Sequence, residues 1–152
     1  MDRLAAAGTA APSAPARLLV CERTGRWAVA LRRELAEAGV RVWETRTLDD
    51  CLQELAESPA SFVILHLESN AAGLLGCLAR QRREFPRARV AVVADRRWAG
   101  YEGLLREAGA TSFLCSPRRL GQLAQLACRH LAQVPPPVQS LADRIWAGLP
   151  WG

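Results

Sequence analysis

The chain has 152 residues, of which 50% are hydrophobic and 23% are charged, with a formal net charge of +5. This composition is that of one folded domain and excludes a disordered chain. No apolar run approaches the roughly 20 residues that a membrane-spanning helix needs, and the amino-terminal residues lack the apolar core of a signal peptide. We therefore expect a cytoplasmic protein that does not enter the membrane.

All 20 basic residues are arginine and none is lysine. No reaction that needs a lysine amine, such as a Schiff base or a lysine phosphate clamp, can run on this chain alone. The five cysteines are odd in number, widely spaced and without a C-x-x-C pair. We expect them to be free thiols in a reducing compartment, and neither a disulfide framework nor a metal site. They are Cys21, Cys51, Cys77, Cys115 and Cys128.

Residues 1–16 are rich in Ala, Pro, Gly and Ser, and they predict a flexible leader. From residue 17 onward, short apolar runs alternate with amphipathic segments that end at Gly or Pro. The predicted strands are 18–21, 40–43, 62–65, 90–93 and 111–115. The predicted helices are 26–38, 48–58, 72–84, 100–108 and a last one around 120–131, with Gly39 closing the first and Thr47 capping the second.

The strands differ in how apolar they are. Residues 62–65 read Phe-Val-Ile-Leu and belong at the centre of a sheet, whereas residues 40–43 alternate and belong at an edge. Five strands alternating with five helices over residues 17–133 predict an α/β fold with a doubly wound parallel sheet. In such folds a ligand binds beyond the carboxyl ends of the strands, which singles out residues 21–23, 66–68, 94–95 and 115–117.

Three segments resemble the receiver domain of response regulators in two-component signalling. They are RLLVCER at 17–23, FVILHL at 62–67 and GATSFLCSP at 109–117, in which Gly109, Ala110, Phe113 and Pro117 keep the pattern of the family. The resemblance covers residues 17–133 and implies a flavodoxin-like (CheY-like) fold with five parallel strands in the order 2-1-3-4-5. It also implies that Phe113 and the last helices belong to the surface with which receivers pair.

The positions that carry the chemistry of that family depart from its pattern. Where the family has the acidic pair that binds magnesium, this chain has Glu22 and Arg23. Where the family has the phospho-accepting aspartate, this chain has His66. The hydroxyl residue that the family has at the end of the fourth strand is replaced by Ala94, and the lysine before the proline is replaced by Ser116. Phosphoryl transfer to a receiver needs a carboxylate acceptor and a magnesium ion held by carboxylates. We therefore expect a degenerate pseudo-receiver that has lost its magnesium site, and no catalytic residues or cofactor.

Two hypotheses concern this degenerate pocket. His66 either fills it as a neutral, hydrogen-bonded side chain, which we favour, or faces Glu22 and senses pH. Arg23 is expected to pair with Glu22 or with Glu68, which would replace the metal by an internal ion pair. Cys115 lies beside Ser116 but has no base placed to activate it, and we expect a structural thiol there.

Arginines also cluster around the third helix and after the fourth strand. A nucleic-acid-binding face is the second functional reading, but no recognition helix accompanies it and a solvated face is favoured. The arginines are Arg80, Arg82, Arg83, Arg87, Arg89, Arg96 and Arg97.

Residues 134–152 form a proline-rich spacer followed by a short amphipathic segment. Leu141, Ile145, Trp146 and Leu149 would share one face of a helix that starts after Ser140. A helix this short needs a surface to dock on, either its own domain or a partner. Trp146 and Trp151 are therefore candidate interaction residues.

The favoured function is that of a stand-alone module that binds proteins in bacterial signal transduction. The expected partner is a protein, such as a histidine kinase or another regulator, and a homodimer is one form of such pairing. An active, phosphate-accepting receiver is the third reading.

Overall fold

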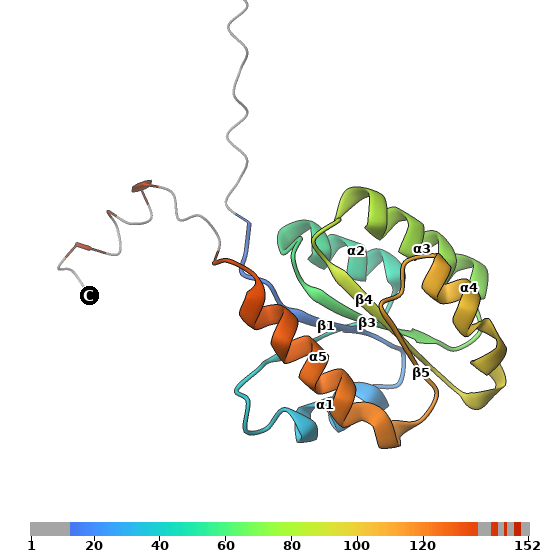
Figure 1. Ribbon diagram of the computed structural model, residues 1–152. Coiled ribbons are helices and arrows are strands. Elements are labelled where there is room, and N and C mark those ends of the chain that lie inside the picture. The colour runs from blue at the N-terminus through green and yellow to red at the C-terminus, as the bar shows by residue number, and fades with distance from the viewer. Residues whose placement is uncertain (1–12, 137–140, 143–144, 146–147, 150–152) are drawn as a thin grey trace, which may run out of the picture.

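The computed structural model describes residues 13–136, 141–142, 145 and 148–149, and every statement below concerns those residues. Strands and helices alternate along the chain (Figure 1). The strands are β1 (Leu18–Cys21), β2 (Val42–Thr45), β3 (Phe62–Leu67), β4 (Arg89–Ala94) and β5 (Ser112–Leu114). The helices are α1 (Arg26–Glu34), α2 (Leu48–Glu57), α3 (Ala71–Glu84), α4 (Glu102–Glu107) and α5 (Leu120–Gln133), with 3-10 turns η1 (Arg96–Tyr101) and η2 (Pro117–Arg119).

The strands form one parallel sheet in the order β2-β1-β3-β4-β5. This confirms the predicted flavodoxin-like order 2-1-3-4-5 and the edge position of the second strand. It also confirms that the most apolar strand is central, because Ile64 pairs with Val20 on one side and with Ala91 on the other.

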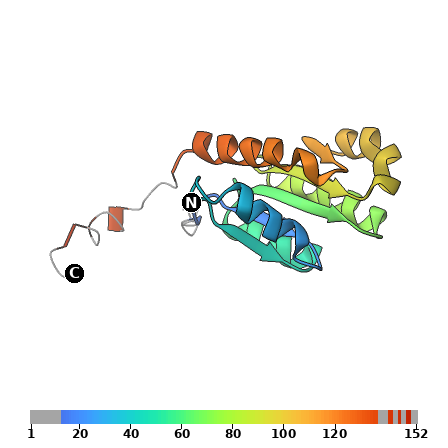
Figure 2. The same cartoon turned by 90° about the horizontal axis from the view of Figure 1, so that it is seen from below.

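The sheet is covered on both faces, and its central strand supplies side chains to both. Phe62 and Ile64 pack with residues of α1 and α5, which contact each other on one face (Figure 2). Val63 and Leu65 pack with α2, α3 and α4 on the other face. A strand buried on both sides must be apolar at every position, which explains the unbroken run in the sequence.

Two boundaries near the second strand differ from the sequence prediction. The second strand is Val42–Thr45 and not 40–43, because its pairing with β1 matches Leu18 to Val42 and Cys21 to Thr45. Helix α1 ends at Glu34 and not at residue 38. The residues that follow make tighter bonds three apart, such as Ala38 N–H to Leu35 O at 3.0 Å, before Gly39 turns the chain with a φ of +66°.

The fourth helix also differs from its prediction. Residues 96–101 form the 3-10 turn η1, and α4 covers only Glu102–Glu107. The only buried residue of α4 is Leu105, so this element offers little apolar surface to hold a longer helix. The predicted start of the second helix is confirmed, since the Thr47 side chain accepts a hydrogen bond from Asp50 N–H at 3.1 Å.

Within the described residues, no helix is long and apolar enough to cross a membrane. In the carboxy-terminal tail, Leu141 and Ile145 have helical backbone, and the side chains of Leu141, Ile145 and Leu149 are exposed. Trp146 and Trp151, the predicted interaction residues, lie outside the described residues.

The central strand generates a stability prediction. Ile64 is fully buried, whereas Val29 on α1 is 49% exposed. Replacing Ile64 by Ala removes buried methyl groups and leaves a cavity, so we expect Ile64→Ala to lower the free energy of unfolding by about 2–5 kcal/mol in urea titrations. Val29→Ala is the matched control and should cost less than about 0.5 kcal/mol. Equal costs at both positions would contradict the central placement of β3.

Candidate functional site

The carboxyl edge of the sheet brings three of the predicted site residues together. Glu22, Arg23 and His66 line a hollow of about 160 Å³ between the ends of β1 and β3 and the start of α3. Ala94 and Ser116, the other two predicted pocket residues, are not among its lining residues. The hollow is completed by Cys21, Arg46, Leu48, Glu68, Ser69, Asn70 and Leu74.

The carboxylate of Glu22 is bound to the first turn of α1. One oxygen accepts a hydrogen bond from Ala28 N–H at 2.7 Å, and the other accepts from Trp27 N–H at 3.1 Å and from the Thr24 hydroxyl at 3.4 Å. Glu22 is only 3% exposed. The first N–H groups of a helix have no partner in the helix itself, and a carboxylate beside them also meets the positive end of the helix dipole. Glu22 therefore acts as the cap of α1, a role that its position at a strand end did not predict.

Arg23 forms no ion pair with any described residue, so the predicted pairing with Glu22 or Glu68 is wrong. The physical reason is that Glu22 is turned away to α1, while the Arg23 side chain is exposed. The loop is held instead by Arg46, whose Nη1 donates to the carbonyl oxygens of Arg23 at 3.0 Å and Glu22 at 3.4 Å. Arg46 was missed in the sequence because a single arginine after a strand gives no signal of such a role.

His66 lies on the same side of β3 as Phe62 and Ile64 and packs near Trp27. The ring centroids of His66 and Trp27 are 6.1 Å apart, with the planes tilted by 54°. Both ring nitrogens of His66 are buried and have no hydrogen-bond partner among the described residues. The prediction of a hydrogen-bonded His66 is therefore wrong, and the Glu22 carboxylate in the same hollow is hydrogen-bonded to the backbone of α1 instead.

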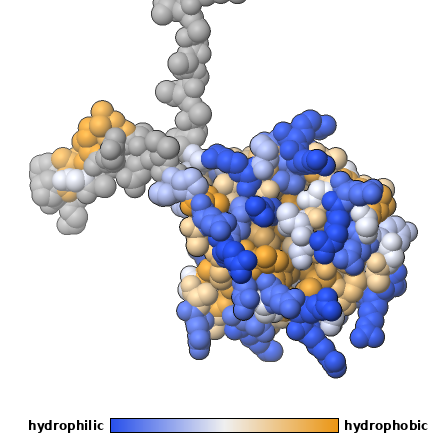
Figure 3. All heavy atoms as spheres, viewed as in Figure 1, coloured by the Kyte–Doolittle hydropathy of each residue, from blue (hydrophilic) through white to orange (hydrophobic). Residues whose placement is uncertain are grey.

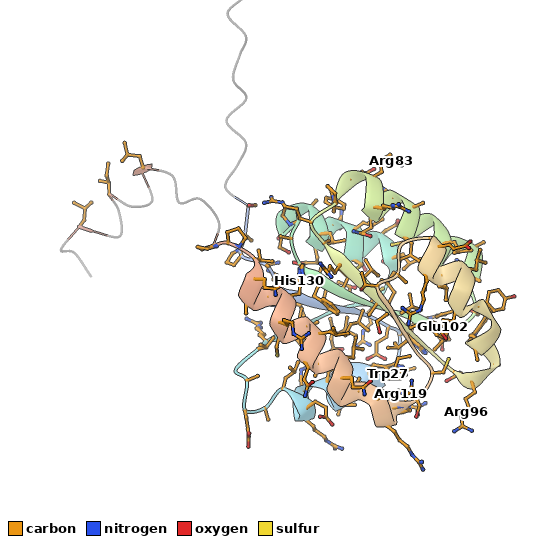
Figure 4. All side chains as sticks on the ribbon, viewed as in Figure 1. Trp27, Arg83, Arg96, Glu102, Arg119 and His130 are labelled. Atoms are coloured by element: carbon orange, nitrogen blue, oxygen red, sulfur yellow. The ribbon has the colours of Figure 1, made fainter. Side chains whose placement is uncertain are left out.

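Trp27 was predicted only as part of the buried stripe of the first helix. The structure places it on the side of the molecule where α1 and α5 meet (Figure 4). With His66 it brings two rings to the position where the receiver family places its acceptor. The sequence signal that could have predicted this role is the spacing. Trp27 follows Glu22 by five residues and lies in the first turn of α1, beside the end of the strand.

The remaining predicted site residues have structural roles. Ala94 is 1% exposed and packs in the core between the sheet and α2, α3 and α4. The Ser116 side chain accepts a hydrogen bond from Arg118 N–H at 3.3 Å and so caps η2. Phe113 on β5 is half-buried against the same core cluster as Ala94.

Three of the five cysteines are buried, and all five are free thiols, as predicted. The pKa of Cys21 is lowered because its sulfur accepts a hydrogen bond from the Cys51 thiol, and the pKa of Cys51 is raised because that thiol is the donor and is buried. Burial raises the pKa of Cys77 to about 11 and also raises the pKa of Cys115. The Cys115 thiol donates to the Asp95 carbonyl at 3.6 Å, in keeping with the predicted structural role.

The arginines of the predicted nucleic-acid face lie at opposite edges of the sheet. Arg89 begins β4, whereas Arg96 and Arg97 follow its last residue, so about 20 Å of strand separates the two groups. Figure 4 accordingly shows Arg83 and Arg96 at opposite ends of the domain. Arg80 is paired with Glu84 at 3.0 Å, and Arg97 donates to the Glu68 carbonyl at 2.6 Å. These residues do not form one basic face.

Comparison with known proteins rests on solved structures, because no family model and no curated protein matches the chain. A response regulator from Thermotoga maritima superimposes with a TM-score of 0.62 at 20% identity, covering 79% of this chain and 100% of that one. The beryllofluoride-activated NtrC4 receiver domain dimer gives 0.64 at 18% identity, covering 76% and 98%. A protein described as adenylate cyclase from Rhodopirellula baltica gives 0.62 at 11% identity, covering 90% and 100%.

The fold of the chain follows from its strand order and from these neighbours. The chain has the flavodoxin-like fold of response regulator receiver (CheY-like) domains, as its sequence resemblance predicts. At identities of 20% and below, this likeness concerns the fold and not the chemistry of the pocket.

The role of Glu22 can be tested by removing its carboxylate. Glu22→Ala leaves two N–H groups of α1 without their acceptor, and we expect the free energy of unfolding to fall by about 2–4 kcal/mol. Glu68→Ala removes a half-buried carboxylate with no ion pair among the described residues and should cost less than about 1 kcal/mol. Urea unfolding followed by circular dichroism measures both. A cost at Glu22 no greater than at Glu68 would contradict the capping role.

The thiols generate a second prediction. At pH 8, the raised pKa of about 11 keeps Cys77 protonated, and its burial limits access. Iodoacetamide added to the native protein should therefore label Cys77 and Cys51 far more slowly than the half-buried Cys128, as peptide mass spectrometry would show. In denaturant all five should react at similar rates. Fast native labelling of Cys77 would contradict its placement.

Proposed function

We propose that the chain is a pseudo-receiver that works without phosphorylation, as a protein-interaction module in bacterial signal transduction. The proposal rests on the receiver fold, which implies a place in two-component signalling, and on the arrangement of the pocket. One observation carries it: the remaining carboxylate of the acidic pair, Glu22, caps α1, and an imidazole packed near Trp27 stands where the acceptor would be.

The residues of the pocket do not fit magnesium. Magnesium needs several oxygen ligands held in octahedral geometry. The two oxygens of Glu22 accept three hydrogen bonds, and the second acidic position is the cation Arg23. No group of three or more His, Cys, Asp or Glu side chains suited to a metal ion occurs in the described part of the chain. We derive no phosphoryl-transfer step through this pocket.

The face formed by α4, β5 and α5 supports the role of a binding module. It carries the exposed apolar side chains of Leu104 and Leu126, which are 48% and 39% exposed, and Tyr101 precedes α4 with 41% exposure. Exposed apolar side chains on a small domain favour contact with a protein. We propose a histidine kinase or another regulator as the partner. A second copy is the alternative, and one structural neighbour is a receiver dimer.

A regulatory role also fits the absence of a catalytic constellation in the pocket. We propose that the chain is not an enzyme, although one protein of the same fold is described as an adenylate cyclase. Receiver domains are generally regulatory. Among the described residues, no base is hydrogen-bonded to the Cys115 thiol, which donates to the Asp95 carbonyl. We also propose a cytoplasmic location, in keeping with free thiols throughout.

Acetyl phosphate tests the loss of phosphorylation directly. The protein is incubated with acetyl phosphate and magnesium, and its intact mass is measured beside an active receiver domain that has the acceptor aspartate. We expect the mass of this chain to stay unchanged while the control gains a phosphoryl group, because an acyl phosphate needs the missing carboxylate. A stoichiometric gain of one phosphoryl group would overturn the proposal.

A further inference from the structure

A second hollow lies away from the receiver pocket, between α5 and the amino ends of β4 and β5. Its volume is about 160 Å³, and no carboxylate lines it. Figure 3 shows hydrophobic surface on this side of the molecule, bordered by hydrophilic side chains. The lining residues are Phe62, Arg89, Thr111, Leu126, Arg129, His130 and Gln133.

The floor of the hollow is apolar and fixed in place. Phe62 is 2% exposed, and the His130 ring packs against it with centroids 5.8 Å apart. His130 is anchored in turn, because its Nε2 donates to the Ala60 carbonyl at 2.8 Å. Leu126 on α5 extends this apolar surface outward to solvent. A rigid apolar floor of this size suits one side chain of a partner.

The rim of the hollow is positively charged. Arg89 and Arg129 are exposed and form no ion pair with any described residue. A third guanidinium lies near, because Arg106 Nη1 donates to the Thr111 carbonyl at 3.4 Å. Two uncompensated guanidinium groups beside an apolar floor attract a carboxylate, which an arginine binds with two parallel hydrogen bonds.

We propose that this hollow binds an acidic segment of a partner protein, with one apolar side chain on the floor and flanking carboxylates on Arg89 and Arg129. The inference rests on the proposed function, because it names the chemistry of the partner that such a module binds.

Charge complementarity favours this occupant over the two alternatives. In a symmetric dimer through this hollow, Arg89 and Arg129 of the two copies would face each other, and such like charges repel. Nucleic acid presents a row of phosphates, and tight binding needs several contacts along a continuous basic surface. The hollow is a single site with an apolar floor, which fits a side chain better than a phosphate backbone.

Fluorescence anisotropy with the full chain tests the proposal. The probe is a fluorescein-labelled peptide in which glutamates flank a single phenylalanine, at low salt. Two control probes are measured in the same way: the same peptide with glutamine in place of glutamate, and a labelled single-stranded DNA oligonucleotide. The variant Arg89→Gln/Arg129→Gln is compared with Arg118→Gln/Arg119→Gln, which removes the same charge at the other end of α5. Thermal melting checks that both variants fold, and sedimentation checks for dimers.

We expect the wild-type chain to bind the acidic peptide and not the glutamine peptide. The double variant at Arg89 and Arg129 should weaken binding by at least about tenfold, because two charge-assisted contacts are lost. The control at Arg118 and Arg119 should weaken it by less than about threefold, since distant exposed charges contribute little. Equal losses in both variants, stronger binding of DNA, a dimer lost with Arg89 and Arg129, or no binding of the peptide would each overturn the inference. Acetyl phosphate tests the proposed function separately, so the two can fail independently.

Discussion

The hydrogen bonds between the Glu22 carboxylate and the first turn of α1 are the interaction on which the rest of the site depends. They place a negative charge in a buried position where two backbone N–H groups and a helix dipole stabilise it. Because the carboxylate is used in this way, it neither pairs with Arg23 nor hydrogen-bonds to His66. In keeping with this, Arg23 is exposed, and the His66 ring packs near Trp27 without a hydrogen-bond partner among the described residues.

The fold could be predicted from the sequence in most of its parts, because it depends on patterns that local sequence carries. An unbroken apolar run such as residues 62–65 specifies a central parallel strand, and Thr47 specifies the start of a helix. The predicted boundaries were wrong where tertiary contacts determine the ends of an element. The second strand lies at 42–45 because β1 sets its register. After Glu34, α1 gives way to tighter bonds such as that from Ala38 N–H to Leu35 O.

The candidate site was less predictable, because its residues act through directions that sequence does not record. The positions of Glu22, Arg23 and His66 at strand ends were predicted correctly, and the structure brings them together. Which way the Glu22 carboxylate turns depends on the left-handed Gly25, with a φ of +79°, that brings the start of α1 over it. Arg46, which directly follows β2, donates to carbonyl oxygens of the same loop, and no sequence motif predicts this contact.

The hydrogen bonds that Arg46 and Arg97 donate to backbone carbonyls connect the loops of the domain. Each guanidinium joins two loops at the carboxyl edge of the sheet through backbone carbonyls, which every sequence supplies and no covalent modification alters. A ligand that binds at this edge can shift the arrangement of these loops only by the difference in its affinities for the alternative arrangements. If the domain works without phosphorylation, as we propose, its output follows the concentration of the bound molecule, as in a titration.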